Sequence, residues 1–202
     1  MKSKVNFKQY GTFPDMDTVK EIVIYGAKKG QDKKQYMFKD FDGNVCTKTF
    51  DEVFYDATGL GQHLYTLGMK NKKVAILSEN SYYWIAAFYS IATGKMTAIP
   101  LDPKLTDADL TDLMVRSGCD AIYSTKDFSS AIEMMKNTDG VKLTEYLPME
   151  DFDKLVEAGH SELANGADNY LDDEVNADDL GFIVYTSGTT GKSKCVMLSQ
   201  KN

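Results

Sequence analysis

The sequence predicts an α/β fold: a parallel sheet built from βαβ units, with helices on its flanks. Three short, unbroken apolar runs, at residues 73–78, 96–100 and 120–125, are typical of strands that are covered on both faces. Helical patterns and short loops separate these runs. This alternation is the order of right-handed crossovers between parallel strands, so the three runs are expected to lie in one sheet.

Before the first of these strands, the chain is expected to form a helix, a hairpin and a second helix. Apolar residues recur at helical spacing within 17–29. In residues 35–50, apolar and aromatic residues alternate on either side of a turn at 42–44. Thr49 and Glu52 have the spacing of a capping box, which predicts the start of the second helix. Two glycines are expected to weaken this helix without abolishing it: Gly59 and Gly61.

Further elements are expected around and after the three apolar runs. Ser81 is expected to cap an aromatic helix that ends at Gly94. A second helix is expected to run from Thr106 to Arg116 and to stop at the following Ser-Gly pair. Another helix and two more strands complete the pattern: 127–136, 141–147 and 180–188.

Composition and charge limit the classes of function. The chain has 202 residues, of which 43% are apolar and 26% charged, so a globular core is expected. A formal net charge of -7 argues against nucleic acid or an anionic membrane surface as the main partner. No apolar run reaches the roughly 18 residues that a membrane span requires. Any polyanion would therefore have to be bound at a local site.

The cysteines and histidines point to no metal centre. Cys46, Cys119 and Cys195 lie far apart and lack a C-x-x-C spacing, which favours reduced thiols in a cytoplasmic protein. His63 and His160 are too few for a His-rich metal site, and each is expected to be an ordinary surface or packing residue.

Residues 168–179 contain six carboxylates. Their spacing matches no calcium-loop pattern, so we interpret residues 166–179 as a solvated acidic linker rather than a cation site. The linker leads into an expected hairpin at 180–199, which contains the stretch "YTSGTTGKSK".

That stretch has the composition of a phosphate-binding loop. Gly188 and Gly191 allow backbone conformations in which successive N–H groups converge on an anion. Lys192 and Lys194 add positive charge. Four hydroxyl groups add donors and suit an accompanying Mg²⁺: Thr186, Ser187, Thr189 and Thr190. These groups together suit a polyphosphate.

Two other interpretations of this loop are open. It could be a flexible Gly/Ser/Thr surface loop. It could also be a Walker loop, since residues 191–193 read G-K-S, but the Walker pattern requires glycine at position 186, where this chain has Thr186. A Walker loop also opens a helix, whereas residues 195–198 form a short apolar run that favours a strand. The loop is therefore expected to join two strands.

The stretch "IVYTSGTTGKSKCVMLSQKN" resembles the phosphate-loop signature of the adenylate-forming synthetases, which include acyl-CoA synthetases, firefly luciferase and the adenylation domains of peptide synthetases. Upstream, "VAILSENSYYW", "PLDP" and "FKDFDGNVCTKTFDEV" resemble the N-terminal subdomain of the same family. The resemblance covers about residues 20–202. The ending "CVMLSQKN" is most similar to long-chain fatty acid CoA ligases.

The resemblance implies a two-step reaction with ATP, Mg²⁺ and coenzyme A. A carboxylate, here expected to be a fatty acid, attacks the α-phosphate of ATP to give acyl-AMP and pyrophosphate, and a thiol then displaces AMP. The resemblance implies that seven residues grip the β- and γ-phosphates: Thr186, Ser187, Gly188, Thr189, Thr190, Gly191 and Lys194. It also implies that Thr186 approaches the Mg²⁺.

This sequence departs from the family pattern at three positions. Ser193 stands where the pattern has proline, which is expected to leave the loop less pre-organised by about 0.4 to 1 kcal/mol. Cys195 stands where glycine is usual, so positive φ is not expected there, and Gln200 replaces a frequent histidine. None of the three removes a phosphate donor.

The resemblance also implies that residues 1–202 are a truncated N-terminal domain. The C-terminal domain is expected to be absent, and the catalytic lysine to lie beyond Asn202. The fragment alone is therefore expected to be inactive, and its hairpin edge to favour a homodimer. The alternative is a non-catalytic nucleotide-binding or interaction module that retains only the phosphate loop.

Overall fold

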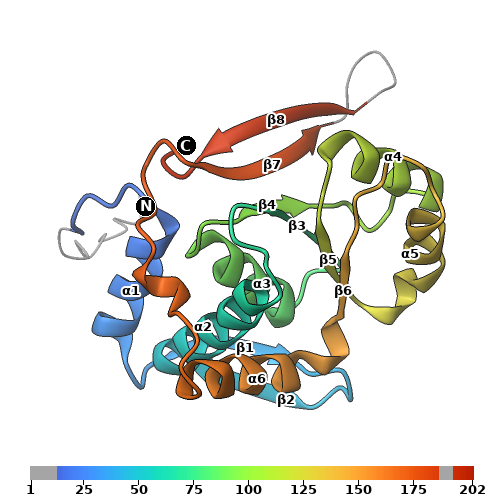
Figure 1. Ribbon diagram of the computed structural model, residues 1–202. Coiled ribbons are helices and arrows are strands. Elements are labelled where there is room, and N and C mark those ends of the chain that lie inside the picture. Colours follow the sequence, from blue (N-terminus) through green and yellow to red (C-terminus); the bar gives the residue numbers. More distant parts are fainter. Residues whose placement is uncertain (1–12, 187–192) are drawn as a thin grey trace, which may run out of the picture.

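The computed structural model describes residues 13–186 and 193–202, and a six-stranded sheet lies at its centre (Figure 1). Its strands follow the order β6-β5-β3-β4-β7-β8. All neighbouring strands are parallel except β7 and β8, which are antiparallel. The predicted parallel α/β fold is therefore confirmed. The strands of this sheet are β3 (Lys73–Leu77), β4 (Thr97–Pro100), β5 (Ala121–Ser124), β6 (Glu145–Pro148), β7 (Leu180–Thr186) and β8 (Lys194–Ser199).

Helices cover both faces of the sheet. The α-helices are α1 (Val19–Gly30), α2 (Phe50–Thr66), α3 (Tyr82–Ala92), α4 (Asp107–Ser117), α5 (Ser129–Lys136) and α6 (Phe152–Ala164). Short 3-10 turns are η1 (Lys126–Phe128), η2 (Met149–Asp151) and η3 (Tyr170–Asp172). Along β3, Val74 and Ile76 pack against α2, α3 and α6, whereas Ala75 and Leu77 pack against α4 and α5. Strands that are buried on both faces in this way explain the unbroken apolar runs.

The predicted helix boundaries follow from their caps. The hydroxyl of Thr49 accepts from the backbone N–H of Glu52, and the Glu52 carboxylate accepts from the N–H of Thr49, which is the predicted capping box. The hydroxyls of Ser81 and Thr106 cap α3 and α4 by accepting from the backbone N–H groups of Trp84 and Asp109. Gly118 ends α4 in the left-handed conformation, with a φ of 59°.

A separate hairpin, β1 (Lys34–Lys39) with β2 (Val45–Thr49), confirms the prediction for residues 35–50. Gly43 in its turn has a φ of 85°, which favours glycine. Phe38 stacks on Tyr82 of α3 with 4.5 Å between ring centroids, so the hairpin is attached to the main body through aromatic contacts.

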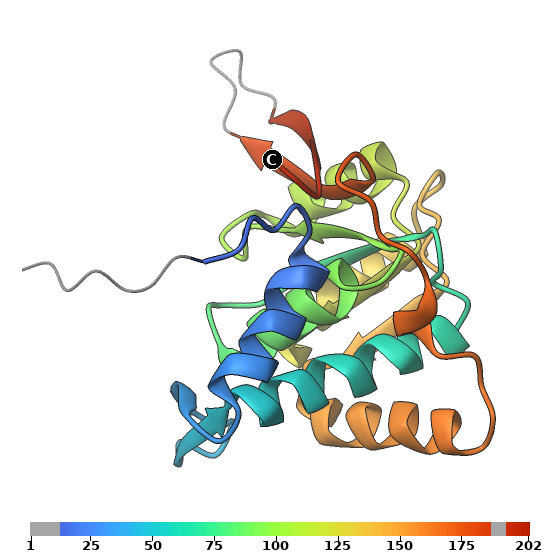
Figure 2. The ribbon, with the colours of Figure 1, turned by 90° about the vertical axis from the view of Figure 1, so that its left-hand side faces the viewer.

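A helix that was not among the expected elements, α6, lies along the outer side of α2 (Figure 2). The two helices approach closely at Gly59 and Gly159. A Cβ atom on Gly159 would overlap the carbonyl oxygen of Gly59, and one on Gly59 would lie 2.6 Å from the carbonyl oxygen of Val156. Gly59, expected only to weaken α2, is thus needed for helix packing. His63 and His160 also lie at this interface, where His63 Nδ1 is 2.8 Å from Glu162 Oε1.

The acidic segment 166–179 connects α6 to β7 and is attached to the body at Tyr170. This side chain is buried, and its hydroxyl lies 2.9 Å from Thr93 Oγ1. The Gln62 side chain accepts from the N–H of Tyr170 and donates to the carbonyl of Asp168, at 3.0 and 2.9 Å. The carboxylates are therefore carried on a segment with a buried aromatic anchor, which composition alone does not indicate.

Candidate phosphate-binding hairpin

The residues on the two sides of the predicted phosphate loop form antiparallel strands, β7 and β8 (Figure 1). This agrees with the prediction that the loop joins two strands. Of the seven predicted site residues, the structure describes Thr186 and Lys194, which pair directly across the two strands at the mouth of the loop. The other five lie outside the described residues: Ser187, Gly188, Thr189, Thr190 and Gly191.

The pairing determines where the two described side chains point. Residues directly opposite each other in an antiparallel pair project from the same face, so Thr186 and Lys194 share one face of the hairpin. Both are exposed, and within residues 13–186 and 193–202 no carboxylate forms a salt bridge with Lys194. A hydroxyl donor and an ammonium group are therefore available to an anion on one side of the mouth.

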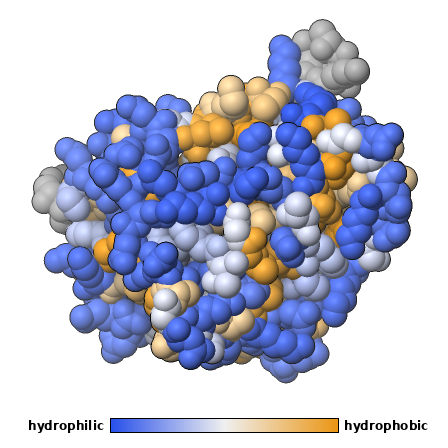
Figure 3. Space-filling view, viewed as in Figure 1, coloured by the Kyte–Doolittle hydropathy of each residue, from blue (hydrophilic) through white to orange (hydrophobic). Residues whose placement is uncertain are grey.

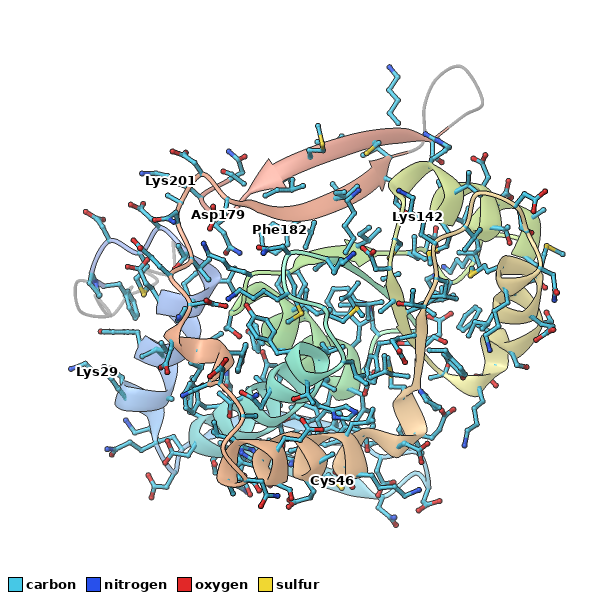
Figure 4. The ribbon with its side chains drawn as sticks, in the orientation of Figure 1. Lys29, Cys46, Lys142, Asp179, Phe182 and Lys201 are labelled. Carbon is cyan, nitrogen blue, oxygen red and sulfur yellow. The ribbon has the colours of Figure 1, made fainter. Side chains whose placement is uncertain are left out.

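The position in the sheet also suits a ligand. The mouth of the loop lies at the carboxyl end of β7, which runs parallel to β4. Ligands of open α/β sheets bind outside the carboxyl ends of the strands. Further back along β7, Phe182 points into the body of the molecule and stacks on Phe88 of α3, with 5.1 Å between ring centroids (Figure 4).

The opposite face of the hairpin contacts α4 through Tyr185 and Arg116, residues that were not predicted to belong to the site. The Tyr185 hydroxyl donates to the carbonyl of Leu113 at 3.3 Å, and the Arg116 guanidinium lies 5.6 Å from the Tyr185 ring centroid. Arg116 also donates to the carbonyl of Ser193, with 2.6 Å between nitrogen and oxygen. Burial raises the pKa of the Tyr185 phenol above its usual value. The motif gave no signal for Arg116, because it lies 69 positions before Tyr185.

At the other end of the hairpin, Gln200 is buried and links three parts of the fold. Its side-chain amide donates to the carbonyl of Ala92 at the end of α3, at 3.1 Å. Its side-chain oxygen accepts from the N–H of Val19 at the start of α1, at 3.2 Å. The side chain also packs on Gly181 of β7. The departure from histidine at this position therefore places an amide that satisfies two backbone groups.

Replacing Gln200 with alanine is expected to lower the free energy of unfolding by about 1–3 kcal/mol, because a buried carbonyl and an N–H lose their partners. Urea denaturation followed by circular dichroism measures this change. Gln200→Glu keeps the shape but not the donor to Ala92, so it should also destabilise. Asn165→Ala, at an exposed amide, is the control and should change stability by less than about 0.5 kcal/mol. Wild-type stability in both Gln200 variants would contradict the linking role.

The two other departures also have structural counterparts. Cys195 lies in β8 and pairs with Tyr185 of β7. In the described chain, the residues other than glycine that have a positive φ are Gln31 and Asn71, so Cys195 is not one of them. Extended backbone at Cys195 needs no glycine, as expected. Ser193 contributes the carbonyl that Arg116 binds.

Thr186, the predicted magnesium ligand, is among the described residues. Within residues 13–186 and 193–202 no group of three or more His, Cys, Asp and Glu side chains could hold a metal ion. Mg²⁺ is commonly held by one or two protein groups, several waters and substrate phosphates. The exposed hydroxyl of Thr186 at the mouth fits that kind of site, in which the nucleotide itself supplies oxygens.

β8 forms the outer edge of the sheet, and an apolar area crosses the top of the molecule where the hairpin lies (Figure 3). Met197 on this strand is 68% exposed. An edge strand offers unpaired backbone groups to another chain. Pairing with a second copy stays a prediction.

In the part of the chain that the structure describes, every helix is too short or too polar to span a bilayer.

Comparison with known proteins identifies relatives of two kinds. The chain is 25% identical over 191 residues to gramicidin S synthase 2 of Brevibacillus brevis, a match that covers 94% of this chain and 4% of that protein. It is 28% identical over 169 residues to acyl-CoA synthetase ALT10 of Alternaria alternata, which covers 71% of this chain and 30% of that protein. The chain thus spans less than a third of the length of either relative.

Among solved structures, the fold is similar to that of the N-terminal domain of FACL13 from Mycobacterium tuberculosis, with a TM-score of 0.77 at 21% identity. That match covers 92% of this chain and 45% of the other. The AMP-binding enzyme family matches residues 25–202, which is most of the chain and includes the whole hairpin. The chain therefore belongs to the AMP-binding enzyme family, whose members are adenylate-forming ligases.

Proposed function

We propose that this chain supplies the phosphate-binding part of an ATP-dependent acyl-CoA synthetase. The observation that carries the proposal is the direct pairing of Thr186 with Lys194 at the carboxyl end of β7, in a chain of the AMP-binding enzyme family. Residues 1–202 form the N-terminal part of the large domain in this proposal, with residues 166–179 leading into the phosphate-loop hairpin at 180–199. A cytoplasmic location and free thiols are part of the same proposal.

In the proposed reaction, a fatty acid carboxylate attacks the α-phosphate of ATP, and pyrophosphate leaves with the β- and γ-phosphates. Negative charge grows on the bridging oxygen as it leaves. Lys194 offsets this charge through its ammonium group, and the Thr186 hydroxyl donates to a phosphate oxygen. The Thr186 hydroxyl would also hold Mg²⁺, which would neutralise further phosphate charge. Coenzyme A then takes the acyl group and AMP leaves.

The length of the acyl chain and the choice of thiol are further parts of the proposal. The relatives include an acyl-CoA synthetase and a gramicidin S synthase, so the family alone is compatible with more than one acceptor. We favour coenzyme A and a long-chain fatty acid because the ending "CVMLSQKN" is most similar to that group.

A binding experiment tests the phosphate role directly. Titration of the purified chain with Mg·ATP in a calorimeter is expected to give saturable binding. Thr186→Val keeps a β-branched side chain but loses the hydroxyl, and it is expected to raise the Kd about three- to tenfold. The control is Thr47→Val, an exposed threonine on β2 far along the chain from the loop, which should leave the Kd unchanged. Equal Kd values for wild type and Thr186→Val would remove Thr186 from the site.

The alternative, a non-catalytic module that has kept the loop, predicts the same binding but no chemistry. Isotope exchange between pyrophosphate and ATP distinguishes the two functions, because exchange requires that acyl-AMP forms reversibly. The assay uses the complete gene product with fatty acids of increasing length. Exchange that depends on the fatty acid supports the synthetase, and nucleotide binding without exchange supports the module.

A further inference from the structure

Arg116 is the single arginine of the chain, and it makes three contacts at the end of α4. One guanidinium nitrogen donates to the carbonyl of Ser193 at 2.6 Å, and another donates to Asp112 Oδ2 at 3.2 Å. The guanidinium carbon lies 5.6 Å from the centroid of the Tyr185 ring. Tyr185 lies in β7 and Ser193 directly precedes β8. The Arg116 side chain therefore contacts both sides of the loop mouth.

These contacts come from the face of the hairpin that is opposite to the proposed phosphate site. Side chains alternate between the two faces of a strand, so Tyr185 projects away from the face that carries Thr186. Leu113, one turn before Arg116, accepts the hydrogen bond of the Tyr185 hydroxyl. Helix α4 therefore supports the mouth of the loop from behind and leaves the Thr186 and Lys194 side uncovered.

The contacts of α4 with the hairpin matter because β7 pairs with its neighbour β4 at few positions, none of them near the loop. β7 has one ladder pair with β4, Ala98 and Phe182, and the Thr97 hydroxyl donates to the carbonyl of Leu180 at 3.1 Å, at the end of β7 away from the loop. Beyond Phe182 the hairpin continues toward the loop with β8 as its partner, and β8 is the edge strand. This part of the hairpin is attached to the body by the buried side chain of Ile183 and, nearest the loop, by the contacts of α4 with Tyr185 and Ser193.

An arginine is better suited to this task than a lysine. The guanidinium is planar and carries donors in a fixed fork, so it can bind a carbonyl and a carboxylate while one face lies near an aromatic ring. A lysine has the same charge but a single ammonium group. The Arg116 side chain is 33% exposed, and its hydrogen bond to Ser193 lies at the surface.

We propose that Arg116 is a positioning residue of the phosphate site: it holds the strand ends at Tyr185 and Ser193, and through them it fixes Thr186 and Lys194 toward the phosphates. The role of Thr186 and Lys194 rests on the proposed function, whereas the attachment of the hairpin does not. This difference allows the two ideas to be tested separately.

The experiment compares wild type with Arg116→Lys, Arg116→Met and the control Lys104→Met, an exposed cation in the loop before α4. Two quantities are measured on the whole chain. Hydrogen exchange of the backbone amides is followed along β7 and β8, and the Kd for magnesium pyrophosphate is determined by calorimetry. Thermal unfolding checks that the overall fold is retained.

In Arg116→Met, the amides near the mouth, at residues 184–186 and 194–196, are expected to exchange about tenfold faster, because a charge-assisted hydrogen bond and a cation–ring contact are lost. The amides of Phe182 and Leu198 should be unchanged. The Kd should rise about fivefold or more. Arg116→Lys should lie between wild type and Arg116→Met in both measurements, and Lys104→Met should behave as wild type.

Two outcomes would overturn the inference. One is wild-type exchange and wild-type affinity in Arg116→Met. The other is faster exchange at the mouth with an unchanged Kd, since the attachment would then have no bearing on the phosphate site. If the wild-type chain binds no pyrophosphate while Arg116→Met still speeds exchange only at the mouth, the attachment by Arg116 is supported and the proposed function fails.

Discussion

Replacing Gly159 with alanine is expected to destabilise the protein by about 3 kcal/mol, because α6 can no longer lie against α2. The new methyl group would overlap the carbonyl oxygen of Gly59 and would lie 2.9 Å from the backbone nitrogen of His63. Both are main-chain atoms inside a helix, so neither can turn aside as a flexible side chain could. Alanine favours a helix over glycine by about 1 kcal/mol, which is too little to offset the overlap.

Chemical denaturation, followed by circular dichroism, measures this loss. The matched control is Gly26→Ala, the same chemical change inside α1, where the added Cβ would meet the Phe50 ring at an ordinary 3.4 Å. That variant is expected to be neutral or more stable by about 0.5–1 kcal/mol. If the two variants were equally stable, the close contact between α2 and α6 would not contribute as described.

Replacing Lys194 with alanine is expected to raise the Kd for magnesium pyrophosphate about ten- to hundredfold. The ammonium group is exposed beside Thr186, and one such charge near a protein surface contributes about 1–4 kcal/mol to binding an adjacent anion. The loss should shrink as salt is added, because screening weakens exposed charges. In the proposed complete synthetase, the same substitution should slow pyrophosphate exchange while fatty acid binding stays nearly unchanged.

Lys201→Ala is the control for charge alone. Lys201 lies just beyond the other end of β8 and forms a salt bridge with Asp17 at 2.9 Å, so its removal changes the net charge by the same amount far from the mouth. Its Kd should be close to that of wild type. A similar loss of affinity in both variants would mean that net charge, rather than the position of Lys194, determines binding.

The elements that could be predicted are those whose signals are local. Unbroken apolar runs identified β3, β4 and β5, and Thr49, Ser81 and Thr106 marked helix starts, because a cap is a contact between neighbours in sequence. The hairpin followed from the strand-like residues on both sides of the glycine-rich loop.

The features that escaped prediction depend on partners far apart in the chain. Helix α6 buries three residues, one of them Gly159, and its place in the fold is set by contact with α2. The anchor at Tyr170 depends on Thr93 and Gln62, and the site contact of Arg116 depends on α4 lying behind β7. No spacing within a motif reports such pairs. The motif therefore indicates the residues proposed to face the phosphates, such as Thr186 and Lys194. The contact of Arg116 with the other face of the hairpin becomes visible only in the fold.

The single junction between β4 and β7 makes the hairpin a lever arm. Its pivot is near Phe182, and Thr186 lies four residues further out, which is about 13 Å along a strand. A tilt of about 5° at the pivot would move the tip by about 1 Å, a displacement that can cost an enzyme about a hundredfold in rate. Gln200, on the short side of the pivot, and Arg116, on the long side, are therefore placed to resist such a tilt, together with the buried side chains of Phe182 and Ile183 at the pivot.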